Sequence, residues 1–141
     1  MAKNKLLHAA STDQILQAFY TVYNTLGYGF LEKVYENALA LELKQRGFQV
    51  EQQAPVHVYY AGQPVGKYFA DLLVENQVIV ELKTAEAIST AHEAQLLNYL
   101  RATGIEVGLI LNFGPKPQFR RKVFTHHRPQ DTQRRTKTPS R

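Results

Sequence analysis

Cysteine is absent from the 141 residues of this chain, which excludes disulfides, thiolate zinc sites and cysteine nucleophiles. The lack of cysteine fits a reducing compartment. No segment has an apolar run long enough to span a membrane, and the first ten residues (MAKNKLLHAA) hold too short a run for a signal peptide. We therefore expect a cytoplasmic protein that does not associate with membranes.

Two common catalytic motifs are also missing. The serines have no Gly-x-Ser-x-Gly context, which argues against a serine hydrolase of the usual kind. Gly27-Tyr28-Gly29 lacks the third glycine and the preceding strand of a dinucleotide-binding fingerprint, so it is interpreted as a turn.

Acidic residues are scarce at the C-terminal end. Residues 115–141 contain nine lysines and arginines and one acidic residue, whereas residues 1–114 contain eight basic and eleven acidic residues. We interpret residues 126–141 as a disordered basic tail and residues 8–125 as one folded domain. Basic segments bind phosphates, so Arg120, Arg121 and Lys122 are candidate nucleic-acid contacts.

Hydrophobic periodicity predicts a mixed α/β domain. Helices are expected at 11–27, at 31–46 and at 90–103, with Ser11 and Thr90 as the first residues of capping patterns. Strand patterns occupy 49–53, 56–60, 67–74, 77–83 and 107–113, and 119–124 fits an edge strand. This order predicts a mixed β-sheet flanked by helices on both faces.

The strand segment VIVELKT carries two charges where apolar residues are usual. Side chains alternate along a strand, so Glu81 and Lys83 share one face. The position of Asp71 depends on the preceding hairpin loop. A two-residue loop pairs Asp71 with Val80, whereas a three-residue loop pairs Asp71 with Glu81.

The second register predicts a metal site. Two carboxylates that face each other repel unless a cation lies between them. Oxygen ligands from Asp71, Glu81 and a backbone carbonyl suit Mg²⁺ or Mn²⁺. Lys83 beside such a metal can assist an attacking water or stabilise charge on a phosphate. The alternative is an ion pair between Lys83 and one of the two carboxylates on an exposed face.

The helices add further polar candidates. In the second helix, Glu32 and Glu42 both fall near the apolar side, whereas Glu36 falls nearer solvent. Periodicity does not decide whether Glu32 or Glu42 is the candidate ligand of a metal-bound water. In the third helix, His92, Gln95 and Tyr99 lie along one stripe. Gln95 and Tyr99 can contact a phosphate or a base. The alternative is that this stripe is only the polar flank of an amphipathic helix.

Three motifs together resemble a known family. Gly29-Phe30-Leu31-Glu32-Lys33-Val34-Tyr35 is similar to the motif of the GxxExxY proteins, a branch of the PD-(D/E)XK nuclease superfamily. The segments ADLLV (70–74) and VELK (80–83) resemble the Asp…Glu-x-Lys core of that superfamily, and Gln95-x-x-x-Tyr99 is similar to a helix motif of RecB-type nucleases. The resemblance covers residues 15–124.

The resemblance implies a three-layer restriction-endonuclease-like fold with an αβββαβ core. It implies that Asp71 and Glu81 bind Mg²⁺ or Mn²⁺ together with the Leu82 carbonyl, that Lys83 is the catalytic lysine, and that Glu32 is an acid of the first core helix that reaches the metal through a water. Gln95 and Tyr99 become auxiliary catalytic residues.

The expected function is metal-dependent hydrolysis of phosphodiester bonds in DNA or RNA. Small nucleases of this fold often dimerise, so a homodimer is a further expectation by analogy. The runner-up is a non-catalytic protein on a nuclease fold that binds nucleic acid or a partner. A third interpretation is a structural oligomer in which Asp71, Glu81 and Lys83 form an ion-pair network.

Overall fold

Eight helices and strands make up the part of the chain that the computed structural model describes, residues 8–125. The predicted basic tail, 126–141, lies outside these residues. In chain order, the elements are α2 (Ala9–Leu26), α3 (Glu32–Gln45), β1 (Val50–Tyr60), β2 (Gln63–Val74), β3 (Val78–Lys83), α4 (Thr90–Thr103), β4 (Val107–Phe113) and β5 (Pro117–Val123).

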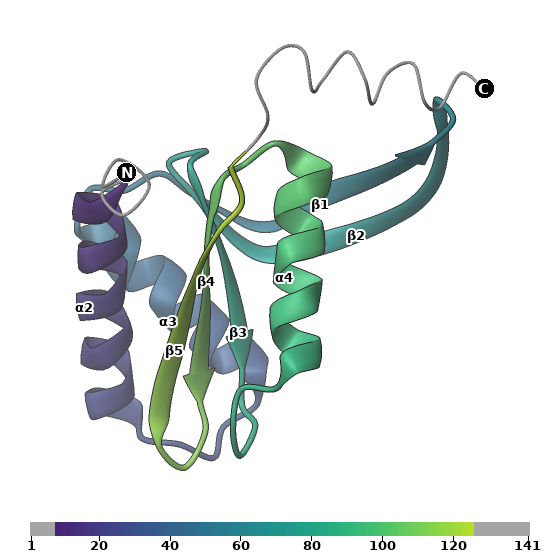
Figure 1. The fold of residues 1–141 in the computed structure, drawn as a ribbon. Coiled ribbons are helices and arrows are strands. Elements are labelled where there is room, and N and C mark those ends of the chain that lie inside the picture. Colours follow the sequence, from purple (N-terminus) through teal and green to yellow (C-terminus); the bar gives the residue numbers. More distant parts are fainter. Residues whose placement is uncertain (1–7, 126–141) are drawn as a thin grey trace.

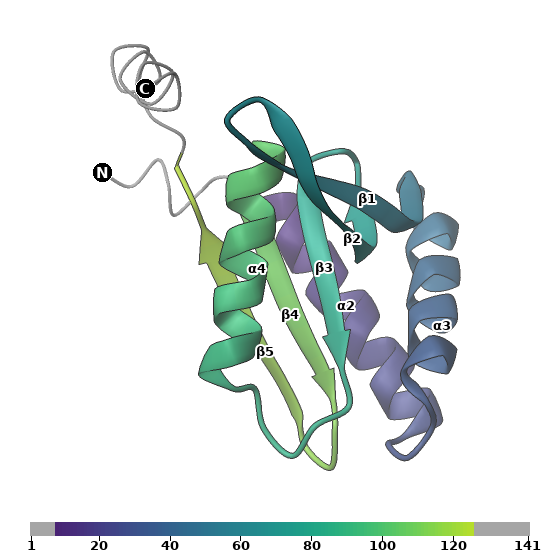
Figure 2. The ribbon, with the colours of Figure 1, turned by 90° about the vertical axis from the view of Figure 1, so that its right-hand side faces the viewer.

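The five strands form one mixed sheet in the order β1-β2-β3-β4-β5. All neighbouring strands are antiparallel except β3 and β4, which are parallel and joined by the crossover helix α4. Helices α2 and α3 cover one face of the sheet and α4 covers the other (Figures 1 and 2). From α3 to β4 the elements follow the expected αβββαβ order, so the predicted α/β class and layering are confirmed.

Strand β3 separates two hydrophobic clusters. Val78, Val80 and Leu82 pack in the cluster beneath α2 and α3, whereas Ile79 packs in the cluster beneath α4. Because side chains alternate along a strand, the next odd position, Glu81, falls on the α4 side of the sheet. The charged residues of this strand therefore face the single crossover helix and not the larger core.

The helix starts differ from those predicted. Helix α2 begins before Ser11, so the Ser-x-x-Gln pattern lies inside the helix and caps nothing. Helix α4 is capped by Ser89, whose hydroxyl accepts from the His92 N–H while the His92 ring accepts from the Ser89 N–H. The predicted box of Thr90 and Glu93 is therefore off by one residue, and Glu93 is engaged in ion pairs with strand β5.

Strands β1 and β2 form one long hairpin where shorter segments were expected. Strand β1 continues through Pro55, which is compatible with an edge strand because an edge residue does not need its outward N–H for pairing. The turn uses Ala61 and Gly62, both with positive φ (51° and 77°). The hairpin reaches past α4, away from the rest of the sheet (Figure 1).

Candidate active site

The register of β2 and β3 decides whether the two carboxylates meet. Val74 pairs with Val78 and Leu72 pairs with Val80, so Asp71 comes opposite Glu81. The connecting loop contains three residues, 75–77, and its first two, Glu75 and Asn76, have positive φ. The three-residue alternative of the sequence analysis is confirmed, and the register that would pair Asp71 with Val80 is wrong.

Where strands β2 and β3 separate, hydrogen bonds from the backbone to the side chains of Asp71 and Glu81 take the place of the backbone–backbone hydrogen bonds. The backbone N–H of Asp71 donates to Oε2 of Glu81 at 2.9 Å, and the N–H of Leu82 donates to Oδ2 of Asp71 at 2.8 Å. Each carboxylate is thus fixed by the opposite strand. The N–H and C=O of one strand residue point to the same edge, so the Leu82 carbonyl faces the same gap as Asp71.

A backbone irregularity in β1 accompanies this arrangement. Gln53 has a φ of 54°, and the β1–β2 ladder skips the position at which Gln53 would pair with Asp71. Ala70 packs in the cluster under α4, whereas Leu72 packs in the cluster under α2 and α3, so the regular alternation is broken between them. The irregularity turns Asp71 toward β3, and Nε2 of Gln53 lies 3.4 Å from its Oδ1.

Glu81 is a buried carboxylate that forms no ion pair with any of residues 8–125. The residue is only 5% exposed, and within the same range its Oε1 accepts no hydrogen bond. Burial and the nearby charge of Asp71 raise the pKa of Glu81 to about 8. The pKa values of Asp71 and Glu32 are also raised, in both cases mainly by burial. Three carboxyl groups therefore share a region in which their ionisation is unfavourable.

Lys83 does not neutralise these carboxylates by direct contact. Its Nζ donates to Oε1 of Gln95 at 3.4 Å, and Nε2 of Gln95 donates to the Tyr99 hydroxyl at 3.2 Å. Among the described residues no ion pair joins Lys83 to Asp71 or Glu81, which contradicts the ion-pair alternative. The chain of hydrogen bonds holds the ammonium group beside the site on the α4 face.

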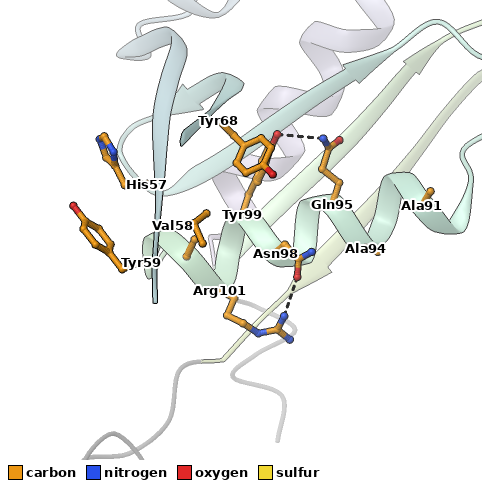
Figure 3. Close-up of a pocket in the computed structure, with 11 residues that line it drawn as sticks. His57, Val58, Tyr59, Tyr68, Ala91, Ala94, Gln95, Asn98, Tyr99 and Arg101 are labelled. Carbon is orange, nitrogen blue, oxygen red and sulfur yellow. Dashed lines mark hydrogen bonds between the residues drawn. The ribbon is translucent and has the colours of Figure 1, made fainter. Parts of the chain in front are cut away.

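Tyr99 closes the site from α4. Burial and the charges of Glu81 and Asp71 raise its pKa to about 12, so its hydroxyl stays protonated. Gln95 and Tyr99 approach the ring of Tyr68, which stands on the overhanging hairpin (Figure 3). His92, the third member of the predicted stripe, serves instead in the cap of α4.

Of the two α3 candidates, Glu32 and not Glu42 lies near the site, and the charge of Glu36 in the same helix also acts on Asp71. The charges of Asp71 and Lys83 both act on Glu32, whereas Glu42 forms an ion pair with Arg46 at 2.9 Å. Glu32 is nevertheless not in a direct ligand position. Within residues 8–125, no group of three or more carboxylate, histidine or cysteine side chains is arranged to hold a metal ion.

Gly29 and Tyr35 explain the local structure that carries Glu32. Gly29 has a φ of 113°, which disfavours any residue with a side chain. The Tyr35 hydroxyl donates to the carbonyl of Gly27 at 2.6 Å and accepts from the N–H of Phe30 at 3.2 Å. The Tyr35 ring stacks on Phe113 of the core at 4.5 Å. These contacts fix the turn directly before α3, and Glu32 is the first residue of that helix.

Glu36 is a buried residue that the sequence analysis placed near solvent, and that placement is wrong. It is 4% exposed and accepts hydrogen bonds from Lys33, Gln52 and Gln53 at 2.8–3.2 Å. The missed signal was the stripe at i, i+3, i+4 and i+7 that begins at Glu36 and continues through buried apolar residues. Those residues are Leu39, Ala40 and Leu43.

The close approach of β4 to the segment after Lys83 was also not foreseen. Asn112 is fully buried, and its amide exchanges two 2.9 Å hydrogen bonds with the backbone of Ala85. A Cβ on Gly114 would lie 2.0 Å from the carbonyl oxygen of Ala85, so only glycine fits there. These contacts hold the chain as it leaves β3.

Arg120, Arg121 and Lys122 lie on β5, the edge strand opposite β1 and β2. Arg120 and Lys122 both pair with Glu93, with an Nε–Oε2 distance of 3.7 Å for Arg120. The sheet order separates these residues from the carboxylates by strand β4. The structure therefore does not bring the predicted basic contacts together with Asp71 and Glu81.

No helix within residues 8–125 has the length and apolar character needed to cross a membrane. Among solved structures, the crystal structure of SSO0001 is similar to this chain, with a TM-score of 0.55 and 17% sequence identity over 94% of this chain. The chain spans 66% of the length of SSO0001. At this identity the similarity concerns the fold, and the predicted restriction-endonuclease-like architecture is confirmed.

No sequence among the curated proteins matches this chain. A model of the PD-(D/E)XK nuclease superfamily matches residues 9–122, which include both strands that carry Asp71 and Glu81 and the helix that carries Gln95 and Tyr99. Since the match covers well over half of its residues, the chain belongs to the PD-(D/E)XK nuclease superfamily.

Proposed function

We propose that this protein is a nuclease that hydrolyses phosphodiester bonds of DNA or RNA with Mg²⁺ or Mn²⁺ as cofactor. The observation that carries the proposal is the direct opposition of the half-buried Asp71 and the buried Glu81, two carboxylates with raised pKa values and no ion pair to any of residues 8–125. Superfamily membership supports the same reaction class.

The donor set fits a hard divalent cation. Oε1 of Glu81, the second oxygen of Asp71 and the carbonyl of Leu82 border the gap between β2 and β3, and all three are oxygen ligands of the kind Mg²⁺ and Mn²⁺ prefer. A bound cation would offset the repulsion that raises the pKa of Glu81. Since two side chains do not complete a coordination shell, waters would fill the remaining positions in the proposed site, and Glu32 would act through one of them.

When bound, the cation supplies a water of lowered pKa and polarises the scissile phosphate. The Lys83 ammonium group, steered by Gln95, donates a hydrogen bond to the attacking water or to the phosphate oxygen as negative charge develops. The Tyr99 hydroxyl is protonated at neutral pH, and its pKa of about 12 keeps it protonated in alkaline solution as well. Gln95 thus orients the lysine, and Tyr99 orients Gln95.

Several finer predictions accompany this proposal. We assign residues 8–125 as the catalytic domain, and the chain as a whole to the GxxExxY branch of the superfamily. A cytoplasmic location and a homodimer also remain predictions. Arg120, Arg121 and Lys122 are proposed to contact the nucleic-acid backbone away from the reacting phosphate, because strand β4 lies between their strand and β3.

The test is metal-dependent cleavage of plasmid, single-stranded DNA and RNA by the purified chain. We expect Lys83→Ala and Asp71→Asn to lower the cleavage rate by at least about 100-fold, as expected for loss of charge stabilisation in the transition state. Glu42→Gln is the matched control, since Glu42 is a partly buried helical carboxylate of α3 that pairs with Arg46.

Cleavage that persists in both site variants would identify a contaminating nuclease and refute the proposal. Metal-independent binding of nucleic acid without any cleavage would instead support the non-catalytic alternative. A calorimetric titration with Mn²⁺ tests the donor set directly, because the proposal predicts binding that depends on Asp71 and Glu81.

A further inference from the structure

A groove runs between the overhanging β1–β2 hairpin and helix α4. Its volume is about 750 Å³, and its walls are formed by Val58 and Tyr68 from the hairpin and by one face of α4 that includes Ala94, Asn98 and Arg101 (Figure 3). We refer to it as the arm groove. The small side chain of Ala94 leaves the helix surface open, and a volume of this size is typical of pockets that enclose a small organic ligand.

The arm groove is continuous with the candidate active site. Gln95 and Tyr99 line the groove and also belong to the hydrogen-bond chain that ends at Lys83. The ring of Tyr68 lies 5.8 Å from the ring of Tyr99. A nucleic-acid strand with one phosphate at Asp71 and Glu81 can therefore place the neighbouring nucleotide in the arm groove.

The chemistry of the lining favours an anionic ligand with flat rings. Tyr68 is 51% exposed and lines the groove, so a base that enters the groove can reach its ring. Arg101 is held by a 2.9 Å hydrogen bond to Asn98 and lies over the Phe124 ring at 5.0 Å, which orients its guanidinium group. Among residues 8–125, none of the side chains that line the groove is a carboxylate.

We propose that the arm groove binds unpaired bases of a single-stranded nucleic acid next to the scissile phosphate. One base stacks on Tyr68, the Asn98 amide hydrogen-bonds the polar edge of a base, and Arg101 contacts the sugar-phosphate backbone of the nucleic acid. This assignment rests on the proposed nuclease function and names its substrate class. A duplex is disfavoured because its bases are paired and stacked on one another, so none of them is free to stack on Tyr68.

The test measures equilibrium binding by fluorescence anisotropy in EDTA, with the full chain and labelled oligonucleotides of equal length. The probes are single-stranded DNA, single-stranded RNA and duplex DNA. We expect at least one single strand to bind about tenfold more tightly than the duplex. We expect Tyr68→Ala to weaken single-strand binding by about tenfold, in keeping with the loss of one stacked base, without changing duplex binding.

Three further variants isolate the groove. Ala94→Leu fills the groove from an exposed helix position and is expected to weaken single-strand binding as Tyr68→Ala does. Tyr68→Phe keeps the ring and is expected to bind within about twofold of the wild type. Tyr60→Ala is the matched control, because Tyr60 is an exposed tyrosine on the same hairpin that does not line the groove.

An abasic probe tests the stacking itself. Replacing the bases of the bound segment by abasic sites should weaken wild-type binding by a larger factor than Tyr68→Ala binding, since the variant has already lost the stacking contact. The proposal allows the wild type to prefer single-stranded DNA, to prefer single-stranded RNA or to bind both equally. The observed preference identifies whether the groove accepts deoxyribose, ribose or both.

Two results would overturn the assignment. The first is single-strand binding that is the same in the wild type, Tyr68→Ala and Ala94→Leu. The second is a wild-type homodimer in sedimentation that Ala94→Leu converts to monomers, which would show that a second copy fills the groove. Because binding is measured in EDTA, failure of the groove assignment is distinguishable from absence of metal-dependent cleavage, which tests the proposed function.

Discussion

Asp71 and Glu81 each receive a backbone hydrogen bond at the point where β2 leaves β3. The N–H of Asp71 donates to Glu81, and the N–H that follows Glu81, from Leu82, donates to Asp71. Each carboxylate is therefore held in place by the backbone of the opposite strand. The cost is electrostatic, because burial raises the pKa of both groups, the charge of Asp71 raises the pKa of Glu81 further, and the charge of Glu36 raises that of Asp71.

The first prediction concerns pH and stability of the metal-free protein. The pKa of Glu81 is raised from 4.5 to about 8, so between these values the folded state retains a proton that the unfolded state has lost. Stability contributed by this proton is fully present below pH 4.5 and is lost as pH rises through about 8. The raised pKa values of Asp71 and Glu32 act in the same direction.

We therefore expect the urea midpoint in EDTA, followed by circular dichroism, to be lower at a pH of about 8.5 than at about 6. Glu81→Gln, which cannot ionise, should show a smaller difference. Mg²⁺ or Mn²⁺ should raise the midpoint more at the higher pH, because the cation competes with the proton for the site. An equal midpoint at both values in the wild type would contradict the raised pKa.

The second prediction concerns Gln53 as a positioning residue for Asp71. Its Nε2 lies between Oε1 of Glu36 at 2.9 Å and Oδ1 of Asp71 at 3.4 Å. Gln53→Asn tolerates the positive φ but is too short to bridge the two carboxylates. We expect calorimetry to show Mn²⁺ affinity weakened by about tenfold, as is typical for loss of a partner behind a metal ligand.

Gln52→Asn is the control for this prediction, since Gln52 contacts Glu36 and Asn37 but not Asp71. A positioning role also predicts that cleavage by Gln53→Asn recovers at high Mn²⁺ concentration. Unchanged Mn²⁺ affinity in Gln53→Asn would show that the contact with Asp71 has no effect on the site.

The third prediction concerns the close contact between Gly114 and Ala85. A Cβ at position 114 would lie 2.0 Å from the Ala85 carbonyl oxygen, a rigid backbone atom, so Gly114→Ala must displace the segment after β3. We expect a loss of about 1–3 kcal/mol in the free energy of unfolding. The control is Gly66→Ala, whose new Cβ would have only ordinary contacts of 3.7 and 3.8 Å. Equal stability of the two variants would disprove the proposed clash.

The fourth prediction concerns the Tyr35 hydroxyl. Tyr35→Phe leaves the N–H of Phe30 and the carbonyl of Gly27 without their partner, so we expect a loss of about 1–2 kcal/mol in the free energy of unfolding. Tyr28→Phe, at an exposed position in the same turn, should be neutral. A urea denaturation series measures both variants, and a neutral Tyr35→Phe would mean that the turn before Glu32 does not depend on this hydroxyl.

Much of the site could be predicted from local rules. Strand alternation alone placed Glu81 and Lys83 on one face, and the apolar pattern of VIVELK predicted a buried strand. Glycine at positions 27 and 29 marked the turn before α3, because both positions have φ values that suit glycine. The helix starts were less accurate, since several Ser and Thr residues near each start could serve as the cap.

Long-range pairing could not be read from the same patterns. Whether Asp71 meets Glu81 or Val80 depends on one residue of loop length, and both loops are compatible with the residues Glu75, Asn76 and Gln77. The structure decided it through the positive φ values of Glu75 and Asn76. The burial of Glu36 was missed because its partners, Gln52 and Gln53, come from strand β1.

The sequence by itself determined which strands are buried, which residues carry charge into them, and the family to which the chain belongs. Only the tertiary structure decided that Asp71 opposes Glu81, that Glu32 and not Glu42 acts on them, and that Lys83 is held by Gln95 and not by a carboxylate. The physical reason is that periodicity assigns a side chain to a face, whereas electrostatic coupling depends on distances between segments that only the packed chain defines.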